Sequence, residues 1–139
     1  MKNDGDRDGR LIVGARPAAP QARGATAEAL AERFLARHGL IVVARNVRCR
    51  GGEVDLVCLD RGVVVFVEVR LRSNPRYGGA GASITPSKRR RIVMAARWWL
   101  AGEGRPHAAR ACRFDAALLA DLDENGVEWL RAAFDVDEY

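Results

Sequence analysis

Asp55 and Glu68 are the residues of this sequence best suited to bind a metal ion and do chemistry. Both are carboxylates inside apolar runs, Val54–Leu59 and Val63–Leu71. A carboxylate at the margin of a hydrophobic core is costly unless a cation or a metal neutralises it. Carboxylate oxygens suit hard cations such as Mg²⁺ and Mn²⁺. The two acids therefore form a candidate metal site, provided that the fold brings them together.

The two apolar runs predict an antiparallel β-hairpin with a turn at Arg61-Gly62. Val, Leu and Phe favour strands, and glycine adopts the positive φ that a two-residue hairpin turn requires. Facing residues have Cβ atoms roughly 5 Å apart, where like charges repel each other. With this turn, three pairs face each other: Asp60 and Val63, Asp55 and Glu68, and Glu53 and Arg70.

Two other interpretations of the hairpin stay open from the residues alone. In the first, Glu53, Asp55, Glu68 and Arg70 form a cross-strand charge ladder on a solvated sheet face, since ion-pair networks also perturb carboxylates. In the second, a three-residue loop shifts the pairing and puts Asp55 and Glu68 on opposite faces.

The first helix supplies a third candidate acid. It is expected to begin with Thr26 as its N-cap and to end at Gly39, the C′ residue. Glu28 lies at the edge of the apolar stripe of this helix, where its carboxylate can reach over the sheet toward Asp55 and Glu68. The helix dipole alone also favours an acid in the first turn.

The second helix, from the N-cap Thr85 to about Ala101, belongs to a strongly basic segment. Eight of the 23 basic residues and none of the 18 acidic residues lie between Val69 and Gly102. Such a segment is typical of a polyanion-binding surface, although a basic surface that only aids solubility has the same composition. The cations assigned here to nucleic-acid binding are Arg72, Arg76, Lys88, Arg89, Arg90 and Arg91.

The remaining segments indicate one α/β domain. Residues 1–23 are expected to be a disordered tail and residues 24–139 a single domain. Leu40–Val47 predicts a strand before the hairpin, and Arg110–Leu122 and Val127–Phe134 predict two strands after the second helix. The order α-β-β-β-α-β-β indicates a mixed sheet flanked by helices. The tryptophans at 98, 99 and 129 are expected to pack in the core or at its rim.

Composition argues against a membrane or disulfide-rich protein. The longest apolar runs are far shorter than a bilayer span, and the polar N-terminus lacks the apolar core of a signal peptide. Three cysteines without CxxC spacing indicate neither a disulfide framework nor a structural zinc site. We therefore expect a cytoplasmic protein with no membrane partner, and thiols that are reduced and in or near the core.

Several motifs occur in an order that resembles a known family. They are GGEVDLVCLD, VVFVEVRLR, RYG, a lysine on the following helix, RFD and EWLRAAF. The sequence resembles the YraN-like family of predicted endonucleases, and the match runs from Gly24 to Phe134. The resemblance implies the restriction-endonuclease-like PD-(D/E)xK fold, with an αβββαβ core and a mixed central sheet, similar to Holliday-junction resolvases.

The resemblance also implies roles for individual residues. Asp55 and Glu68 correspond to the metal-binding acids, Glu28 to the additional helix acid, and Arg70 to the usual motif lysine. Lysine can lower its pKa when desolvated and assist an attacking water, whereas arginine stays charged. Arg70 can therefore stabilise phosphate charge but cannot act as a general base. Lys88 is a candidate substitute from the second helix.

Together these observations predict a nuclease that uses Mg²⁺ or Mn²⁺ to hydrolyse phosphodiester bonds of nucleic acid, with DNA as the expected substrate. Its catalytic residues would be Glu28, Asp55, Glu68 and Arg70. The alternative is a nucleic-acid-binding module with a degraded site, which Arg70 favours. A third hypothesis is a protein-interaction or oligomerisation domain with a charged sheet.

Overall fold

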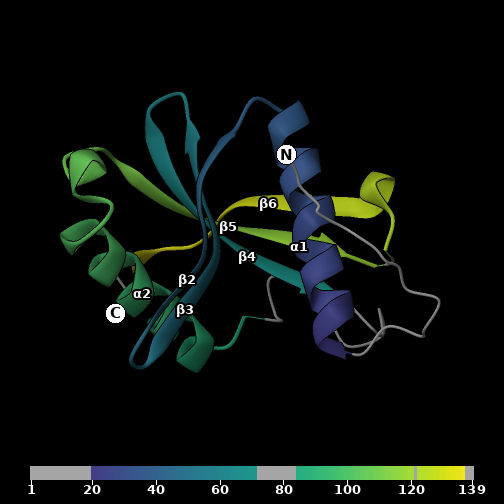
Figure 1. Cartoon of the computed structure of the whole chain (residues 1–139), viewed down its shortest axis with the longest axis horizontal. Helices are drawn as coiled ribbons and strands as arrows, with labels where there is room; N and C mark the ends of the chain where they lie inside the picture. Colours follow the sequence, from purple (N-terminus) through teal and green to yellow (C-terminus); the bar gives the residue numbers. More distant parts are fainter. Residues whose placement is uncertain (1–19, 72–83, 121, 137–139) are drawn as a thin grey trace, which may run out of the picture.

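A five-stranded mixed sheet lies between two helices (Figure 1). The computed structural model describes residues 20–71, 84–120 and 122–136. The order of helices and strands is the one expected from the sequence. The elements are α1 (Pro20–Arg37), β2 (Ile41–Cys49), β3 (Gly52–Asp60), β4 (Val63–Leu71), α2 (Pro86–Ala101), η3 (Arg105–His107), β5 (Cys112–Leu119), η4 (Glu124–Gly126) and β6 (Val127–Phe134).

The strand order is β2-β3-β4-β5-β6, and only β4 and β5 run parallel. Parallel neighbours need a crossover, and α2 lies within the connection between them. The central strand β4 is buried along most of its length, as expected for a strand covered on both faces. The sheet and its two flanking helices confirm the predicted α/β fold class, which is consistent with a restriction-endonuclease-like core.

Each face of the sheet packs against one helix. On the α2 side, Phe66 and Trp99 belong to one core cluster. On the α1 side, Leu35 and Val65 belong to the other. Alternate residues of a strand point to opposite faces, so β4 contributes to both clusters. The sheet therefore separates the two helices.

The hairpin has the predicted two-residue turn. Arg61 and Gly62 both have positive φ, at 52° and 86°, and Asp60 pairs with Val63. This pairing excludes the three-residue loop. The β3–β4 ladder ends at Leu56 and Val67.

The predicted pairings of Asp55 with Glu68 and of Glu53 with Arg70 are therefore not part of the β3–β4 ladder. Glu53 instead pairs with Arg48 in β2. Val54 belongs to the α2-side core and Leu56 to the α1-side core. Residues two apart on a regular strand share a face, so β3 is irregular at Asp55. This irregularity opens the sheet beside the candidate acids.

The predicted helix signals hold at three of four ends. Thr85 is the N-cap of α2, and its side chain accepts a hydrogen bond from the backbone N–H of Lys88 at 3.1 Å. Gly102 is the C-cap of α2. Gly39, with φ of 92°, follows the end of α1. The predicted start of α1 at Thr26 was wrong, because the helix begins at Pro20.

The earlier start of α1 has a physical explanation in its composition. Ala, Gln and Arg in the segment from Pro20 to Ala25 favour helix, and a single internal glycine costs only about 1 kcal/mol. The first four residues of α1 thus fall within the stretch assigned to the tail, and the rest of that stretch lies outside the described residues, as do Arg72 and Arg76.

The side chains expected in the core do not all lie there. Trp99 is buried and Trp129 half-buried, but Trp98 is 53% exposed. Cys58 is buried and Cys49 half-buried, whereas Cys112 is exposed and thus does not fit the expectation of a core thiol. Among the described residues, no helix is long and apolar enough to cross a membrane.

Candidate active site

Asp55 lies just beyond the point where β3 stops pairing with β4, and its side chain takes the place of a main-chain hydrogen-bond acceptor. Its carboxylate accepts a hydrogen bond at 2.8 Å from the backbone N–H of Val69. A backbone N–H away from water needs an acceptor, and here the acceptor is a side chain in place of a neighbouring main-chain carbonyl. The ladder ends, and the Asp55 carboxylate is held between the two strands.

Glu68 is a buried carboxylate, and only one of its two oxygens lies near cationic side chains. It is 3% exposed, and its Oε2 lies 3.6 Å from Nη1 of Arg70 and 3.5 Å from Nζ of Lys88. Its other oxygen, Oε1, is buried and has no hydrogen-bond partner. Buried polar atoms are nearly always hydrogen-bonded, so this oxygen is available to a cation or to a hydrogen-bond donor.

The environment of the site raises the pKa of three carboxyl groups. Burial, followed by the negative charge of Asp55, raises the pKa of Glu68 to about 7 against the opposing charges of Lys88 and Arg70. Burial also raises the pKa of Asp55, with the Val69 N–H acting against it. Clustered acids with raised pKa values are typical of functional sites, since a bound cation would relieve their repulsion.

Glu28 joins this cluster from the other side of the sheet. Burial and then the charge of Asp55 raise its pKa to about 7, so the carboxyl group of α1 is close enough to interact with the acid of β3. Lys88, on α2, reaches Glu68 from the opposite face. The opening between β3 and β4 therefore brings residues from both helices to one place. The structure assembles all four residues proposed as catalytic: Glu28, Asp55, Glu68 and Arg70.

Glu53 is a residue of this site that the sequence analysis did not select. Its carboxylate lies 4.0 Å from Lys88, 3.9 Å from Arg91 and 3.9 Å from Arg48. Lys88 is thus shared by Glu53 and Glu68. The signal in the sequence was its place two residues before Asp55 in the GGEVDL motif, and, after burial, the negative charge of Glu53 contributes to the raised pKa of Asp55.

The described cations among those assigned to nucleic-acid binding divide into three groups. Lys88 and Arg91 belong to the acid cluster. Arg90 is exposed and lines an open cavity of about 250 Å³ beside α2. Arg89 donates to the carbonyl of Ile84 at 2.9 Å and lies over the ring of Phe134, which is a packing role. Arg72 and Arg76 lie outside the described residues.

Asp115 of the RFD motif is a buried acid with a different role. It is 0% exposed, and it accepts hydrogen bonds from the Arg113 guanidinium, the Trp129 indole and the backbone N–H of Ala132. Ala132 has φ of 52° at the irregular pairing of β5 with β6. Asp115 therefore stabilises the edge of the sheet, and its lone pairs are already used.

Comparisons with known proteins give one consistent result. A sequence model described as uncharacterised protein family UPF0102 matches residues 27–119. The UPF0102 protein of Dechloromonas aromatica is 53% identical over 117 residues, covering 84% of this chain and 92% of that protein. The one of Methylobacillus flagellatus is 50% identical over 111 residues, covering 80% and 95%. The chain belongs to the UPF0102 family.

The UPF0102 match confirms the resemblance to the YraN-like family, and its span includes every residue of the acid cluster: Glu28, Glu53, Asp55, Glu68, Arg70 and Lys88. A third relative, the UPF0102 protein of Cupriavidus taiwanensis, is 52% identical over 118 residues, covering 84% of this chain and 86% of that protein. The comparisons assign no activity to the UPF0102 family, so the chemistry has to be argued from the site.

The donor chemistry of the site fits a hard cation. Carboxylate oxygens of Asp55 and Glu68 are the ligands that Mg²⁺ and Mn²⁺ prefer, and Glu68 Oε1 has no other partner. Within the described parts of the chain, no three His, Cys, Asp or Glu side chains are arranged as a complete ligand set. Mg²⁺ usually binds one or two carboxylates and completes its shell with water and substrate phosphates. Two carboxylates are therefore sufficient for such a site.

Proposed function

We propose that this protein is a metal-dependent nuclease that hydrolyses phosphodiester bonds of nucleic acid. The observation that supports this most is the buried Glu68 carboxylate, which has one oxygen without a partner and lies in a cluster of acids and cations from four elements. Asp55 and Glu68 would hold Mg²⁺ or Mn²⁺, and Glu28 would add negative charge from α1. Such a cation, when bound, polarises phosphate and lowers the pKa of water.

The cations beside the acid cluster would bind a phosphate group of the substrate. Lys88, Arg70 and Arg91 lie around the acids, and their charge would orient the phosphate and stabilise the negative charge that develops on it. Lys88 and Arg70 are nearly equidistant from Glu68 Oε2. Arginine differs from the motif residue in charge geometry and proton chemistry, whereas Lys88 is of the same residue type, so Lys88 would carry the role of the motif lysine.

A specific observation also supports the second candidate, a nucleic-acid-binding module with a degraded site. Arg70 stands where the resembled family usually has lysine, and an arginine there can bind phosphate but cannot act as a base. Both candidates would bind nucleic acid through the basic surface, and they differ only in whether the bound strand is cleaved.

The proposal can be tested with metal binding and cleavage measured on the same variants. Mn²⁺ should raise the melting temperature of the wild type, because a ligand that binds only the native state stabilises it. The double variant Asp55→Asn with Glu68→Gln should lose this shift. The matched control is Asp60→Asn, in the same hairpin but paired with Arg113.

Cleavage of labelled duplex and single-stranded DNA and RNA should depend on Mn²⁺ or Mg²⁺ in the wild type and be lost in Glu68→Gln. Equal melting shifts in wild type and double variant would contradict the metal site. Metal and DNA binding without cleavage on every substrate would favour the binding-module candidate.

A further inference from the structure

A row of exposed side chains runs along α2 away from the acid cluster. Arg91, Met94 and Trp98 are spaced three and four residues apart, so they share one side of the helix. Met94 is 50% and Trp98 53% exposed, although both are large apolar side chains. We call these three residues the α2 stripe. Its apolar members are not needed for the core, which Trp99 fills from the next position.

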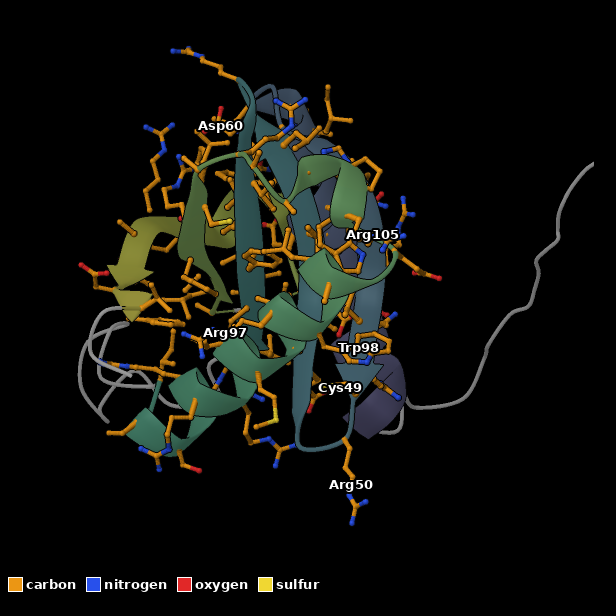
Figure 2. The ribbon with its side chains drawn as sticks, turned by 90° about the vertical axis from the view of Figure 1, so that its left-hand side faces the viewer. Cys49, Arg50, Asp60, Arg97, Trp98 and Arg105 are labelled. Atoms are coloured by element: carbon orange, nitrogen blue, oxygen red, sulfur yellow. The ribbon has the colours of Figure 1, made fainter. Side chains whose placement is uncertain are left out.

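The α2 stripe begins at the acid cluster and passes beside the β2–β3 turn. Arg91 Nη2 lies 3.9 Å from the carboxylate of Glu53. The sulfur of Met94 lies over Gly51, 3.0 Å from the point where a Cβ would be. Figure 2 shows Trp98 on the same flank of α2 as Cys49, at the end of β2, and Arg50, in that turn, with Arg97 on the other flank. At 1.5 Å per residue, Trp98 is about 10 Å along the helix from Arg91.

Cations lie on two sides of the apolar part of the stripe. Arg90 and Arg97 line the open cavity beside Met94, and Arg50 is exposed in the β2–β3 turn. The sequence from Pro86 to Gly102 contains no Asp or Glu. A partner protein with an apolar docking face would meet these positive charges, whereas a polyanion with flat apolar rings matches both features. Single-stranded nucleic acid has this chemistry, because its bases are free to stack on aromatic side chains.

We propose that the α2 stripe binds an unpaired nucleic-acid strand next to the acid cluster, with a base stacked on the indole of Trp98. The inference rests on the proposed function and adds a preference for single-stranded over duplex substrate. Arg91 and the flanking arginines bind phosphates, and Trp98 accepts any base, since every base has a π-face. A paired base inside a duplex does not present that face.

The experiment compares wild type, Trp98→Ala and Trp98→Phe by fluorescence anisotropy. The probes are oligothymidylate and oligouridylate of about 15 nucleotides and a mixed-sequence duplex of the same length, each at several salt concentrations. Ile41→Ala is the control, because Ile41 is another exposed apolar side chain, on the edge strand β2. Trp98→Ala should weaken single-strand binding about tenfold or more and leave duplex binding within about twofold. Trp98→Phe should retain most of the affinity.

The salt dependence separates stacking from charge. Trp98→Ala removes no phosphate contact, so the slope of log affinity against log salt should stay that of the wild type. Equal losses on single strands and duplex, no loss on single strands, or the same loss in Ile41→Ala would overturn the inference. A changed oligomeric state of Trp98→Ala with unchanged nucleic-acid binding would identify a self-association surface instead.

The outcome also separates this inference from the proposed function. Mn²⁺-dependent cleavage together with single-strand binding that Trp98→Ala does not weaken would overturn only the inference. Single-strand binding that depends on Trp98, without cleavage on any substrate, would support the inference and contradict the nuclease. A wild type that binds none of the probes at low salt would overturn both.

Discussion

Lys88 and Arg70 show how a side chain on another element can compensate for a change within a motif. Arg70 follows Glu68 by two residues on β4, and Lys88 comes from the first turns of α2. Both end near the same carboxylate oxygen, at 3.6 Å and 3.5 Å. Spacing along the sequence could identify the first contact. The second depends on how α2 packs on the sheet, which the sequence pattern does not give.

If Lys88 has the role of the motif lysine, its removal should cost more than removal of Arg70. Lys88→Met keeps an unbranched side chain but has no titratable group, and we expect Mn²⁺-dependent cleavage to fall by roughly 10²- to 10⁴-fold. Arg105→Met, at an exposed cation in η3 beyond the end of α2, is the matched control. Rates under single-turnover conditions are the measurement.

The complementary variant is Arg70→Lys, which restores a titratable group at the motif position. It should raise the cleavage rate above that of the wild type and rescue much of the loss in Lys88→Met. If Lys88→Met is as active as the control while Arg70→Met is inactive, then Arg70 carries the reaction and our assignment to Lys88 is wrong.

The raised pKa of Glu68 predicts an unusual dependence of stability on pH. Its folded pKa of about 7 exceeds the ordinary value of 4.5, so between these values the folded protein keeps a proton that the unfolded chain has lost. The free energy of unfolding must then decrease as pH rises through this window, by on the order of 1–3 kcal/mol. With a chelator present, Glu68→Gln should melt at a higher temperature than wild type at about pH 8 and at a similar temperature at about pH 5.

Glu32 offers a control of opposite sign. A hydrogen bond from Arg45 lowers its pKa, so the charged form of Glu32 stabilises the fold above its unfolded pKa, and this stabilisation is lost as pH falls. Glu32→Gln should therefore reduce the melting temperature at about pH 8 and have less effect at low pH. Melting temperatures of the wild type, Glu68→Gln and Glu32→Gln, measured across the pH range, test both predictions. A Glu68→Gln variant that is less stable than wild type at both pH values would contradict the account of the buried acid.

At the scale of elements, the sequence predicted those features that depend on interactions between neighbouring residues. The Arg61-Gly62 turn, the Thr85 N-cap and the Gly39 helix end all depend on a few neighbouring residues, and all three are confirmed. The separation of β3 from β4 at Asp55 was not predicted, because it results from a side chain replacing a backbone acceptor fourteen residues away. The predicted start of α1 was also wrong, because the helix extends six residues before the Thr26 cap signal, to Pro20.

Gly52 fixes how α2 packs on the sheet, and through it the place of Lys88. A Cβ at Gly52 would lie 2.3 Å from the carbonyl oxygen of Arg91 and 3.0 Å from the backbone nitrogen of Ala95. Only a glycine allows the helix backbone to approach β3 so closely. This contact lies about one helical turn after Lys88. The distance between α2 and β3 at Gly52 therefore determines how close the Lys88 ammonium group comes to Glu68.

We therefore expect Gly52→Ala to move α2 away from the sheet and to destabilise the fold by about 1–3 kcal/mol. Cleavage should fall further than stability alone explains, because Lys88 moves with the helix. Gly126→Ala is the matched control, since a Cβ there would meet nothing closer than 4.0 Å. Denaturant unfolding measures the first effect and single-turnover cleavage of the folded fraction the second. Wild-type stability in Gly52→Ala would show that the helix approach is not tight.

At the scale of the whole molecule, the fold divides acids and cations between the sheet and one helix. The acids lie at the opening of the sheet and α2 carries the positive charge beside them, while the arginines of α1 are partly engaged elsewhere: Arg33 and Arg37 pair with Glu124. A polyanion would therefore be attracted to the α2 side of the molecule. This asymmetry was visible in the sequence, but the sequence could not show that Arg89 is committed to packing.

The last prediction concerns this asymmetry and uses the salt dependence of binding. Each phosphate contact that a cation makes adds about one unit to the slope of log affinity against log salt. The double variant Arg90→Ala with Arg91→Ala should reduce the slope for mixed-sequence duplex by about two units. We leave Arg89 unchanged because its removal would disturb the core. Arg33→Ala with Arg37→Ala removes the same charge from α1 and should leave the slope unchanged. Anisotropy titrations at several salt concentrations measure both slopes. Equal reductions in the two double variants would mean that net charge alone attracts the nucleic acid, and that α2 is not its binding surface.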